Sequence, residues 1–272
     1  MAEMEQDDPN RVGSGAAVHP TAIVHPSTTI GDGVKMGPYS VIGSDVVIGD
    51  GCVIGPHVLI EGHTTIGKGN VFHHGVAIGT PPQDLTYKGQ STHVEIGDGN
   101  VFREFVTVNR GSGNGGVTRV GSRCFLMAYA HVAHDCTVGD EVVLANSVHL
   151  GGHVKIDDCA NIGGVTGVHQ FVSVGKHAFV GGGSRVERDI PPFVKVAGSP
   201  TRAYGLNSVG LERHGFPPSK RAMIKSMVNL LYRSGLNVSQ VVEHLKNGSE
   251  FEDPERRILV EFLEKAVRGI TK

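Results

Sequence analysis

Apolar residues recur at every sixth position over more than half of the chain. From Val18 to Val186, almost every residue whose number is divisible by six is apolar, and a glycine often follows it, as in Ile162-Gly163. An amphipathic helix repeats its apolar face about every 3.6 residues and a strand every two, but a coil of three short strands repeats it every six. The pattern therefore predicts a parallel β-helix built from hexapeptide repeats.

Two interruptions of the repeat predict loops. The positions that break the period are Asp84, Gln90 and Asn114. They lie in segments rich in Pro, Gly and polar residues, at about 80–95 and 111–119. Because loops on a rigid scaffold commonly carry binding and catalytic groups, we expect a functional site beside them.

The pattern changes after Val186. The repeat ends at Pro191-Pro192, and helical patterns then cover residues 219–234, 237–246 and a third segment from Asp253 to near Gly269. We expect a flexible N-terminal segment over residues 1–17, a β-helix over 18–190 with the two loops, and a helical domain over 191–272. The helical domain would cover or extend the sheet edge at one end of the β-helix.

The composition narrows the possible functions. The chain has 272 residues with 39 Gly and no Trp, so aliphatic side chains must form its core. Its 25 basic and 27 acidic residues give a formal charge of −2, which argues against a protein that binds nucleic acid mainly through phosphates. The four cysteines form no CxxC pair and predict neither a disulfide framework nor a zinc site, and no apolar run is long enough to span a membrane.

The coil period predicts which side chains meet. With three six-residue strands per coil, residues 18 apart occupy the same place on successive coils, about 4.8 Å apart. This spacing puts His134 beside Gly152 and Asp135 beside His153, with Gln170 and Phe171 one coil further. By the same arithmetic, His131 lies beside His149, and His169 precedes Gln170 in the sequence. One corner of the β-helix therefore gathers imidazole, carboxylate, amide and backbone N–H groups.

Three interpretations of this corner remain open from the residues alone. A histidine held by a carboxylate can take a proton from a hydroxyl that attacks an acyl carbonyl, while a backbone N–H stabilises the oxyanion. Cys136 stands two residues before an aliphatic position and should point inward, so a covalent acyl-cysteine is not expected. The alternatives are a surface corner that tolerates His and Asp, and a zinc site such as the three-histidine site of hexapeptide carbonic anhydrases, although no set of three ligands stands out.

Four motifs resemble those of the UDP-N-acetylglucosamine O-acyltransferase family. They are HVAHDCTVG (His131–Gly139), GVHQF (Gly167–Phe171), PPQDLTYKG (Pro81–Gly89) and VEIGDGNVFREFVTVNRG (Val94–Gly111). The resemblance implies a left-handed β-helix and a homotrimer with active sites between subunits. It also implies transfer of an (R)-3-hydroxyacyl group from acyl carrier protein to the 3-hydroxyl of UDP-N-acetylglucosamine, the first step of lipid A biosynthesis. No cofactor or metal is expected, because the acyl donor is carried on the phosphopantetheine of acyl carrier protein.

The resemblance also implies roles for individual residues. The general base falls on His134, its orienting carboxylate on Asp135 and the oxyanion amide on Gly152. Gln83, Asp84, His131 and His153 would contact the sugar and the acyl chain, and His169 and Gln170 would line the nucleotide and pantetheine region. Asn207 and Arg213 would lie near the uridine diphosphate, and Gly182 would form the floor of the acyl-chain groove.

Some residues depart from the family pattern or extend it. Thr86 stands where the family usually has Lys, with Lys88 nearby, while Val209 and His214 replace a Glu and an Arg. Acyl carrier proteins are acidic, so a basic surface should receive the carrier. Arg185, Arg188, Lys195 and Arg202 are the expected members of that surface.

Other functions remain as alternatives. The sibling N-acyltransferase of the same pathway normally carries an extra N-terminal domain, whereas the repeats here begin by Val18. A hexapeptide-repeat carbonic anhydrase would contain zinc, and a non-catalytic scaffold would assemble without activity. The resemblance implies a cytoplasmic location if the chain is bacterial and a mitochondrial one if it comes from a plant.

Overall fold

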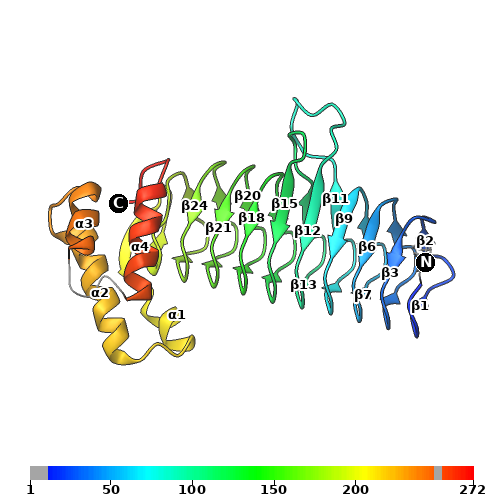
Figure 1. The fold of residues 1–272 in the computed structure, drawn as a ribbon, viewed down its shortest axis with the longest axis horizontal. Helices are drawn as coiled ribbons and strands as arrows, with labels where there is room; N and C mark the ends of the chain where they lie inside the picture. Colours follow the sequence, from blue (N-terminus) through cyan, green and yellow to red (C-terminus); the bar gives the residue numbers. More distant parts are fainter. Residues whose placement is uncertain (1–11, 248–252) are drawn as a thin grey trace, which may run out of the picture. The chain divides into compact units, whose positions relative to one another are not determined.

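The computed structural model describes residues 12–247 and 253–272, and the chain divides into two compact units, Met1–Asp135 and Cys136–Lys272. Each unit is built around its own stack of short parallel strands (Figure 1). Of the segment expected to be flexible, residues 1–11 lie outside the described residues. Val12 forms a parallel bridge with Ile30, and the N–H of Gly13 donates to the carbonyl of Ile30 at 2.8 Å, so hydrogen bonding between coils begins before residue 18.

The first unit is a parallel β-helix with three sheets. One sheet contains β1 (Ala17–Val18), β4 (Lys35–Met36), β7 (Val53–Ile54), β10 (Val71–Phe72), β13 (Val101–Phe102) and β16 (Phe125–Leu126). The second contains β2 (Ile23–Val24), β5 (Val41–Ile42), β8 (Leu59–Ile60), β11 (Ala77–Thr80), β14 (Thr107–Asn109) and β17 (His131–Val132). The third contains β3 (Thr29–Ile30), β6 (Val46–Ile48), β9 (His63–Ile66), β12 (His93–Ile96) and β15 (Val117–Val120).

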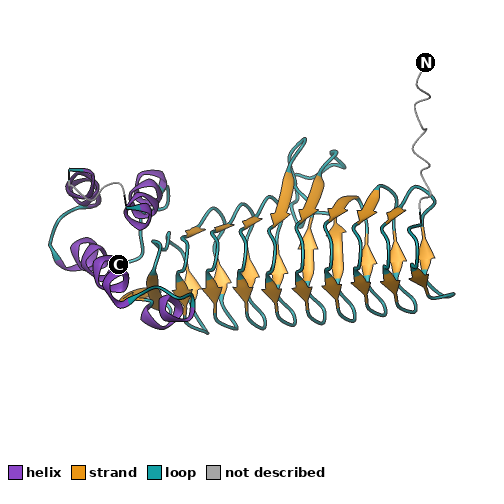
Figure 2. Ribbon diagram, turned by 60° about the horizontal axis from the view of Figure 1, so that its bottom comes forward, coloured by secondary structure: helices purple, strands orange, loops and turns teal. Residues whose placement is uncertain are grey.

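The strand register explains why the six-residue phase survives the two loops. Ile30 pairs with Ile48, 18 residues later, but Ile66 pairs with Ile96 and Ile96 pairs with Val120. The first loop thus adds twelve residues to its coil and the second adds six. Both additions are whole multiples of the repeat, which is why the sequence pattern returns in phase after each loop. The loops project from the unit side by side (Figure 2) and are joined by the N–H of Gly115, which donates to the carbonyl of Ser91 at 3.0 Å.

The residues at every sixth position form the core of the β-helix. Ile30, Ile54 and Ile78 are each no more than 1% exposed. Phe72 and Phe102 stack face to face with ring centroids 4.8 Å apart. Burial of one such side chain contributes about 1.5–3 kcal/mol, so the repeated column is the main source of stability. Cys52, Cys124 and Cys136 are also buried, as expected for small inward-facing residues two positions earlier in the repeat.

The second unit continues with shorter sheets and a C-terminal extension. One sheet contains β19 (Val143–Leu144), β22 (Asn161–Ile162), β25 (Phe179–Val180), β27 (Val194–Ala197) and β28 (Arg202–Leu206). The others contain β20 (His149–Leu150), β23 (Gly167–Val168) and β26 (Arg185–Val186), and β18 (Thr137–Val138), β21 (Lys155–Ile156) and β24 (Ser173–Val174). The sequence pattern did not predict β27 and β28, which are antiparallel to each other and extend the first of these sheets.

Four helices follow β28 in the described part of the second unit. They are α1 (Ser208–Arg213), α2 (Pro218–Arg233), α3 (Val238–Lys246) and α4 (Pro254–Lys265). Pro218 and Pro254 stand at the first turns of their helices, and Asn237 forms a capping box with Gln240. None of the helices among the described residues is long and apolar enough to cross a membrane.

The predicted helices are largely confirmed, with one correction at the C-terminus. The third was expected to reach Gly269, but α4 ends at Lys265, where Ala266 adopts an extended conformation. The chain then turns to pair with Asp189, since the N–H of Asp189 donates to the carbonyl of Gly269 and the N–H of Thr271 donates to that of Asp189. These tertiary hydrogen bonds stop the helix. The predicted fold class, a left-handed parallel β-helix followed by C-terminal helices, is confirmed.

Candidate functional site

His134 is held by the carboxylate that follows it in the sequence. Its Nδ1 lies 2.9 Å from Oδ2 of Asp135, and both side chains are 13% exposed. A carboxylate can only accept a hydrogen bond, so Nδ1 carries the hydrogen and Nε2 keeps its lone pair. The pair thus offers a histidine oriented as a base.

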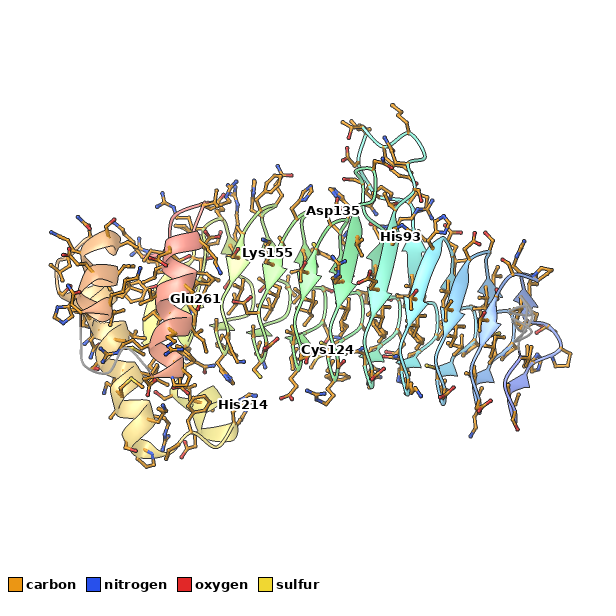
Figure 3. All side chains as sticks on the ribbon, viewed as in Figure 1. His93, Cys124, Asp135, Lys155, His214 and Glu261 are labelled. Atoms are coloured by element: carbon orange, nitrogen blue, oxygen red, sulfur yellow. The ribbon has the colours of Figure 1, made fainter. Side chains whose placement is uncertain are left out.

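The second loop fixes Asp135 in turn. Oδ2 of Asp135 accepts hydrogen bonds from the N–H of Ser112 at 3.0 Å and from its hydroxyl at 2.7 Å. The N–H of Asp135 donates to Oγ1 of Thr118 at 2.8 Å. Asp135 has a φ of +58°, a left-handed conformation at the coil corner that Asp tolerates better than most residues. Figure 3 shows Asp135 near the base of the projecting loops.

The first loop brings a second carboxylate to the same place. Oδ1 of Asp84 accepts hydrogen bonds from the N–H and the hydroxyl of Thr86, both at 2.8 Å. These bonds hold the pKa of Asp84 below its ordinary value, and the nearby charge of His134 and the hydroxyl of Ser112 lower it further. Asp84 is therefore ionised at neutral pH and lies close to His134. Thr86, which departs from the family pattern, serves here to orient Asp84.

His131 and the base of the first loop are also anchored within the first unit. Nδ1 of His131 lies 2.7 Å from Oγ1 of Thr107. The guanidinium of Arg110 donates to the carbonyl of Gly79 at 2.8 Å, and the side-chain amide of Asn109 donates to Oγ1 of Thr80 at 2.8 Å. Gln83 is exposed on the loop that these contacts secure.

In the second unit, Gly152 and His153 stand at a coil corner. The carbonyl of Gly152 accepts a hydrogen bond from the N–H of Phe171 at 3.1 Å. Within residues 136–247 and 253–272, the N–H of Gly152 donates to no protein atom. The ring of His153 stacks on Phe171 with centroids 4.7 Å apart. Gly152 thus has a backbone donor available within its unit, as an oxyanion-binding amide requires.

The remaining histidine and glycine candidates lie on the surface of the second unit. His169 and Gln170 are exposed, and Nδ1 of His169 donates to the carbonyl of Gln170 at 3.1 Å. His169 lines a hollow together with Phe171 and Arg188. Gly182 is exposed, and a Cβ at that position would lie 3.0 Å from the carbonyl oxygen of Gly164, so little room exists there for a side chain.

The two residues expected near the uridine diphosphate differ in their surroundings. Asn207 is 8% exposed and caps α1, because its Oδ1 accepts from the N–H of Gly210 at 3.1 Å and its Nδ2 donates to the carbonyl of His177 at 3.0 Å. Arg213 is exposed in the last turn of α1. Both oxygen and nitrogen of the Asn207 amide are therefore engaged in holding α1.

Three of the four expected carrier-binding residues lie around one hollow. It is lined by Arg185, Glu187, Arg188, Pro200, Thr201, Arg202, Thr271 and Lys272. Lys195 does not line it, and its ammonium lies 5.9 Å from the centroid of the Phe179 ring. Arg185 forms an ion pair with Glu187 at 2.6 Å, so part of its charge is already compensated. Arg188 and Arg202 are the other two arginines of this hollow.

Sequence reasoning missed the residues that orient the site. Ser112, Thr86 and Thr118 position the two aspartates, and the sequence pattern assigned none of them this role. A partial signal was present, since Ser112 and Thr86 lie in the two segments that interrupt the repeat. Their partners could not be read from the sequence, because a loop's path is not fixed by the coil period.

A parallel β-helix with a carboxylate-oriented histidine at a coil corner is typical of hexapeptide-repeat acyltransferases. Family comparisons agree with this class. Residues 118–152 match the profile described as bacterial transferase hexapeptide (six repeats), and residues 189–271 match that of UDP N-acetylglucosamine O-acyltransferase, domain 2.

Similar proteins narrow the class further. The chain is 47% identical over 258 residues to a Thiobacillus denitrificans protein named acyl-[acyl-carrier-protein]--UDP-N-acetylglucosamine O-acyltransferase, covering 94% of this chain and 100% of that one. A Gloeothece citriformis protein of the same name is 50% identical over 175 residues, 64% of this chain and 63% of that protein. The match spans 62% of the length of a Synechocystis relative. The crystal structure of Francisella novicida UDP-N-acetylglucosamine acyltransferase superposes with a TM-score of 0.90 and 40% identity, covering 93% of each chain. The chain belongs to the UDP-N-acetylglucosamine O-acyltransferase family.

Proposed function

We propose that the chain transfers an (R)-3-hydroxyacyl group from acyl carrier protein to the 3-hydroxyl of UDP-N-acetylglucosamine, the first step of lipid A biosynthesis. The observation that carries this proposal is the hydrogen bond from Nδ1 of His134 to Asp135, which leaves Nε2 as a base. The names and coverage of the relatives support the same reaction. Acyl carrier protein and UDP-N-acetylglucosamine are the two substrates.

In the proposed mechanism, His134 moves one proton twice. Nε2 takes the proton of the sugar hydroxyl as its oxygen attacks the thioester carbonyl. The carbon–sulfur bond then breaks, and the imidazolium returns the proton to the departing phosphopantetheine sulfur. Asp135 stabilises the imidazolium between these events. The acyl group moves from sulfur to oxygen, and no cofactor held by the enzyme is needed.

The roles of the other site residues are part of the proposal. Gly152, which the 18-residue period predicts to lie beside His134, would donate its N–H to the oxyanion, as the family resemblance implies. Asp84, Gln83, His131 and His153 would bind the sugar and acyl chain, and His169 and Gln170 the nucleotide and pantetheine. Gly182 would form the floor of the acyl-chain groove, and Asn207 and Arg213 would act near the diphosphate. We further propose a homotrimer with sites between subunits.

The relatives favour this function over its alternatives. The Thiobacillus denitrificans and Gloeothece citriformis proteins are both named as O-acyltransferases, which favours neither the sibling N-acyltransferase nor a carbonic anhydrase. The partly buried, oriented His134–Asp135 pair favours an enzyme over a non-catalytic scaffold. Both relatives are bacterial, so they lend support to the bacterial rather than the plant expectation for location.

We expect thiol release from (R)-3-hydroxyacyl carrier protein to depend on UDP-N-acetylglucosamine. The dependence arises because the sugar hydroxyl, rather than water, is the nucleophile that His134 activates. The measurement follows free thiol by a colorimetric reagent in metal-free buffer, across several acyl lengths, with and without the sugar nucleotide. Glucosamine-based acceptors with a free amine serve as controls for the N-acyltransferase. Equal release with and without acceptor, or preference for the amine, would contradict the proposal.

The basic hollow offers a place for the carrier. Arg188 lines it and also lines the hollow that contains His169 and Phe171. An acidic carrier bound at Arg185, Arg188 and Arg202 could therefore direct its phosphopantetheine toward His169. Such steering by charge acts mainly on association and weakens with salt.

Charge reversal should test this surface. The double change Arg188→Glu and Arg202→Glu should raise KM for the acyl carrier protein about tenfold at low salt, with kcat nearly unchanged. Lys225→Glu, an exposed lysine on α2, is the matched control and should leave KM unchanged. The measurement is steady-state kinetics at two salt concentrations. An unaltered KM in the double variant would place the carrier elsewhere.

A further inference from the structure

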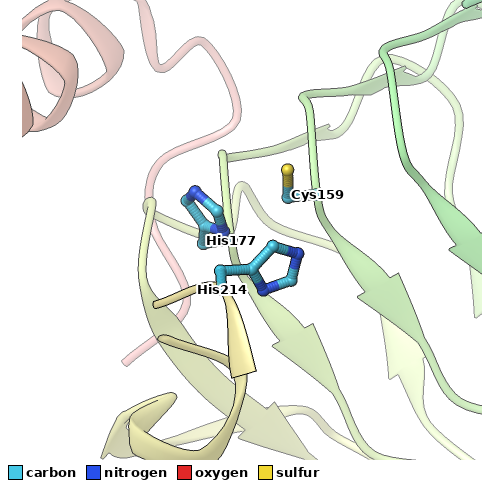
Figure 4. Close-up of side chains that lie close together, drawn as sticks. All are labelled: Cys159, His177 and His214. Carbon is cyan, nitrogen blue, oxygen red and sulfur yellow. The ribbon is translucent and has the colours of Figure 1, made fainter. Parts of the chain in front are cut away.

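Three potential metal ligands meet in the second unit, next to Asn207 and Arg213. Cys159, His177 and His214 each offer one ligand atom, and these atoms all lie within 4.8 Å of one another (Figure 4). The rings of His177 and His214 are roughly perpendicular, with centroids 4.8 Å apart. The sequence pattern does not indicate this group, because His214 belongs to a distant segment.

The coil period accounts for two of the three ligands. Cys159 and His177 are 18 residues apart and occupy the same coil corner, where both have positive φ, +58° and +55°. The N–H of His177 donates to the carbonyl of Asp158 on the preceding coil at 3.0 Å. His214 is contributed by the C-terminal end of α1. The cluster thus joins a corner of the β-helix to a helix.

Both histidines present nitrogens suited to a metal ion. Nδ1 of His214 donates to the carbonyl of Gly210 at 2.8 Å, so its Nε2 keeps a lone pair. Ligating histidines commonly donate their other N–H to a carbonyl in this way. His177 is 6% exposed, and its buried Nδ1 has no hydrogen-bond partner among the described residues. A buried nitrogen without a partner costs free energy, which a bound cation would offset.

We propose that Cys159, His177 and His214 bind one Zn²⁺ ion. One thiolate and two imidazoles form a ligand set that suits zinc, with a fourth position left for water. Ligand atoms around tetrahedral zinc are about 3.3–3.8 Å apart, and the three ligand atoms here lie within 4.8 Å of one another. Phe193 and Phe216 flank His177 and shield this side of the cluster.

In the metal-free protein, the protonation state of His177 favours metal binding, whereas that of Cys159 opposes it. Burial, then the charge of His214, lowers the pKa of His177 to about 4, so that the ring is neutral at pH 7. Burial, then the negative charge of Glu141, raises the pKa of Cys159 to about 11, so the thiol keeps its proton. Zinc binding would convert the thiol to thiolate and release that proton to solvent.

The bound ion would fasten α1 to the β-helix corner. Asn207, which caps the N-terminus of α1, is linked to this corner by the hydrogen bond from its side-chain amide to the carbonyl of His177. Among the described residues, this is the only side-chain hydrogen bond from Asn207 to the corner. A metal ion that joins Cys159 and His177 to His214 would add a second link at the other end of the six-residue helix.

Zinc titration of the chelator-treated full chain should give one equivalent bound per chain. His214→Ala and Cys159→Ala should each weaken binding by at least about 100-fold, since each removes a direct ligand. Affinity is measured by competition with a chromophoric chelator, and Co²⁺ in place of zinc should give a thiolate-to-metal absorption band. His244→Ala, an exposed histidine on α3, is the matched control and should bind like the unaltered chain.

Thermal melting of the same proteins separates binding from folding. Saturating Zn²⁺ should raise the Tm of the unaltered chain and of His244→Ala, but not that of His214→Ala, whose exposed side chain is not needed for folding. The proposal is overturned if the unaltered chain binds no zinc, or if one-equivalent binding persists in His214→Ala. A Co²⁺ complex without the thiolate band would likewise overturn it.

Discussion

His134→Ala should lower kcat by about 10³-fold while leaving the fold intact. In the proposed mechanism this side chain is the proton acceptor in the attack step and the proton donor in thiol departure. Its Nδ1 is held by Asp135, whose carboxylate also accepts from the hydroxyl of Ser112 on the second loop. A loss of this size corresponds to about 4 kcal/mol of transition-state stabilisation. The measurement is acceptor-dependent thiol release under saturating substrates, with circular dichroism to confirm folding.

Two matched variants sharpen this result. Asp135→Asn keeps the size and tolerance of positive φ at the corner but removes the charge that orients His134, so kcat should fall while KM changes little. His25→Ala alters an exposed histidine that bonds to Ser27 on the first coils and should have no effect. Retention of more than about a tenth of kcat in His134→Ala would assign the proton transfer to another group.

Asp189→Ala should lower the free energy of unfolding by about 3 kcal/mol. Asp189 is 1% exposed, and its carboxylate accepts from the N–H of Ser173 at 2.7 Å and from the N–H of Arg268 at 3.1 Å. It thus ties the segment after α4 to a strand of the β-helix. Hydrogen bonds to a charged acceptor contribute about 1.5–3 kcal/mol each, and alanine leaves both amides without this partner.

Urea unfolding at fixed protein concentration measures this change. Asp189→Asn retains one acceptor oxygen and should lose roughly half as much stability. Glu187→Ala, two residues away, removes a carboxylate from a partly exposed ion pair with Arg185 and should cost less than about 1 kcal/mol. If Asp189→Ala and Glu187→Ala unfold at the same urea concentration, the buried carboxylate does not hold the C-terminal segment as proposed.

The chain's sequence alone determined the β-helix, because burial there is periodic. An apolar residue at every sixth position is buried when each coil contains three such repeats, and Asp84, Gln90 and Asn114 then mark the loops. The same period identified the corner that carries His134 and Asp135. Each of these inferences depends on contacts between residues at a fixed spacing. That spacing can be read directly from the linear sequence.

The tertiary structure decided what lies outside that period. The hydrogen bonds from Thr86 to Asp84 and from Ser112 to Asp135 depend on the paths of the first and second loops. These loops add twelve and six residues, which preserves the phase of the repeat but does not determine the direction in which each loop runs. The early end of α4 follows from hydrogen bonds to Asp189, about 80 residues away in the chain, which outweigh local helical propensity. Likewise, the period aligns Cys159 with His177, but only the folding of α1 against that corner brings His214 to them, because the contact joins a periodic segment to a non-periodic one.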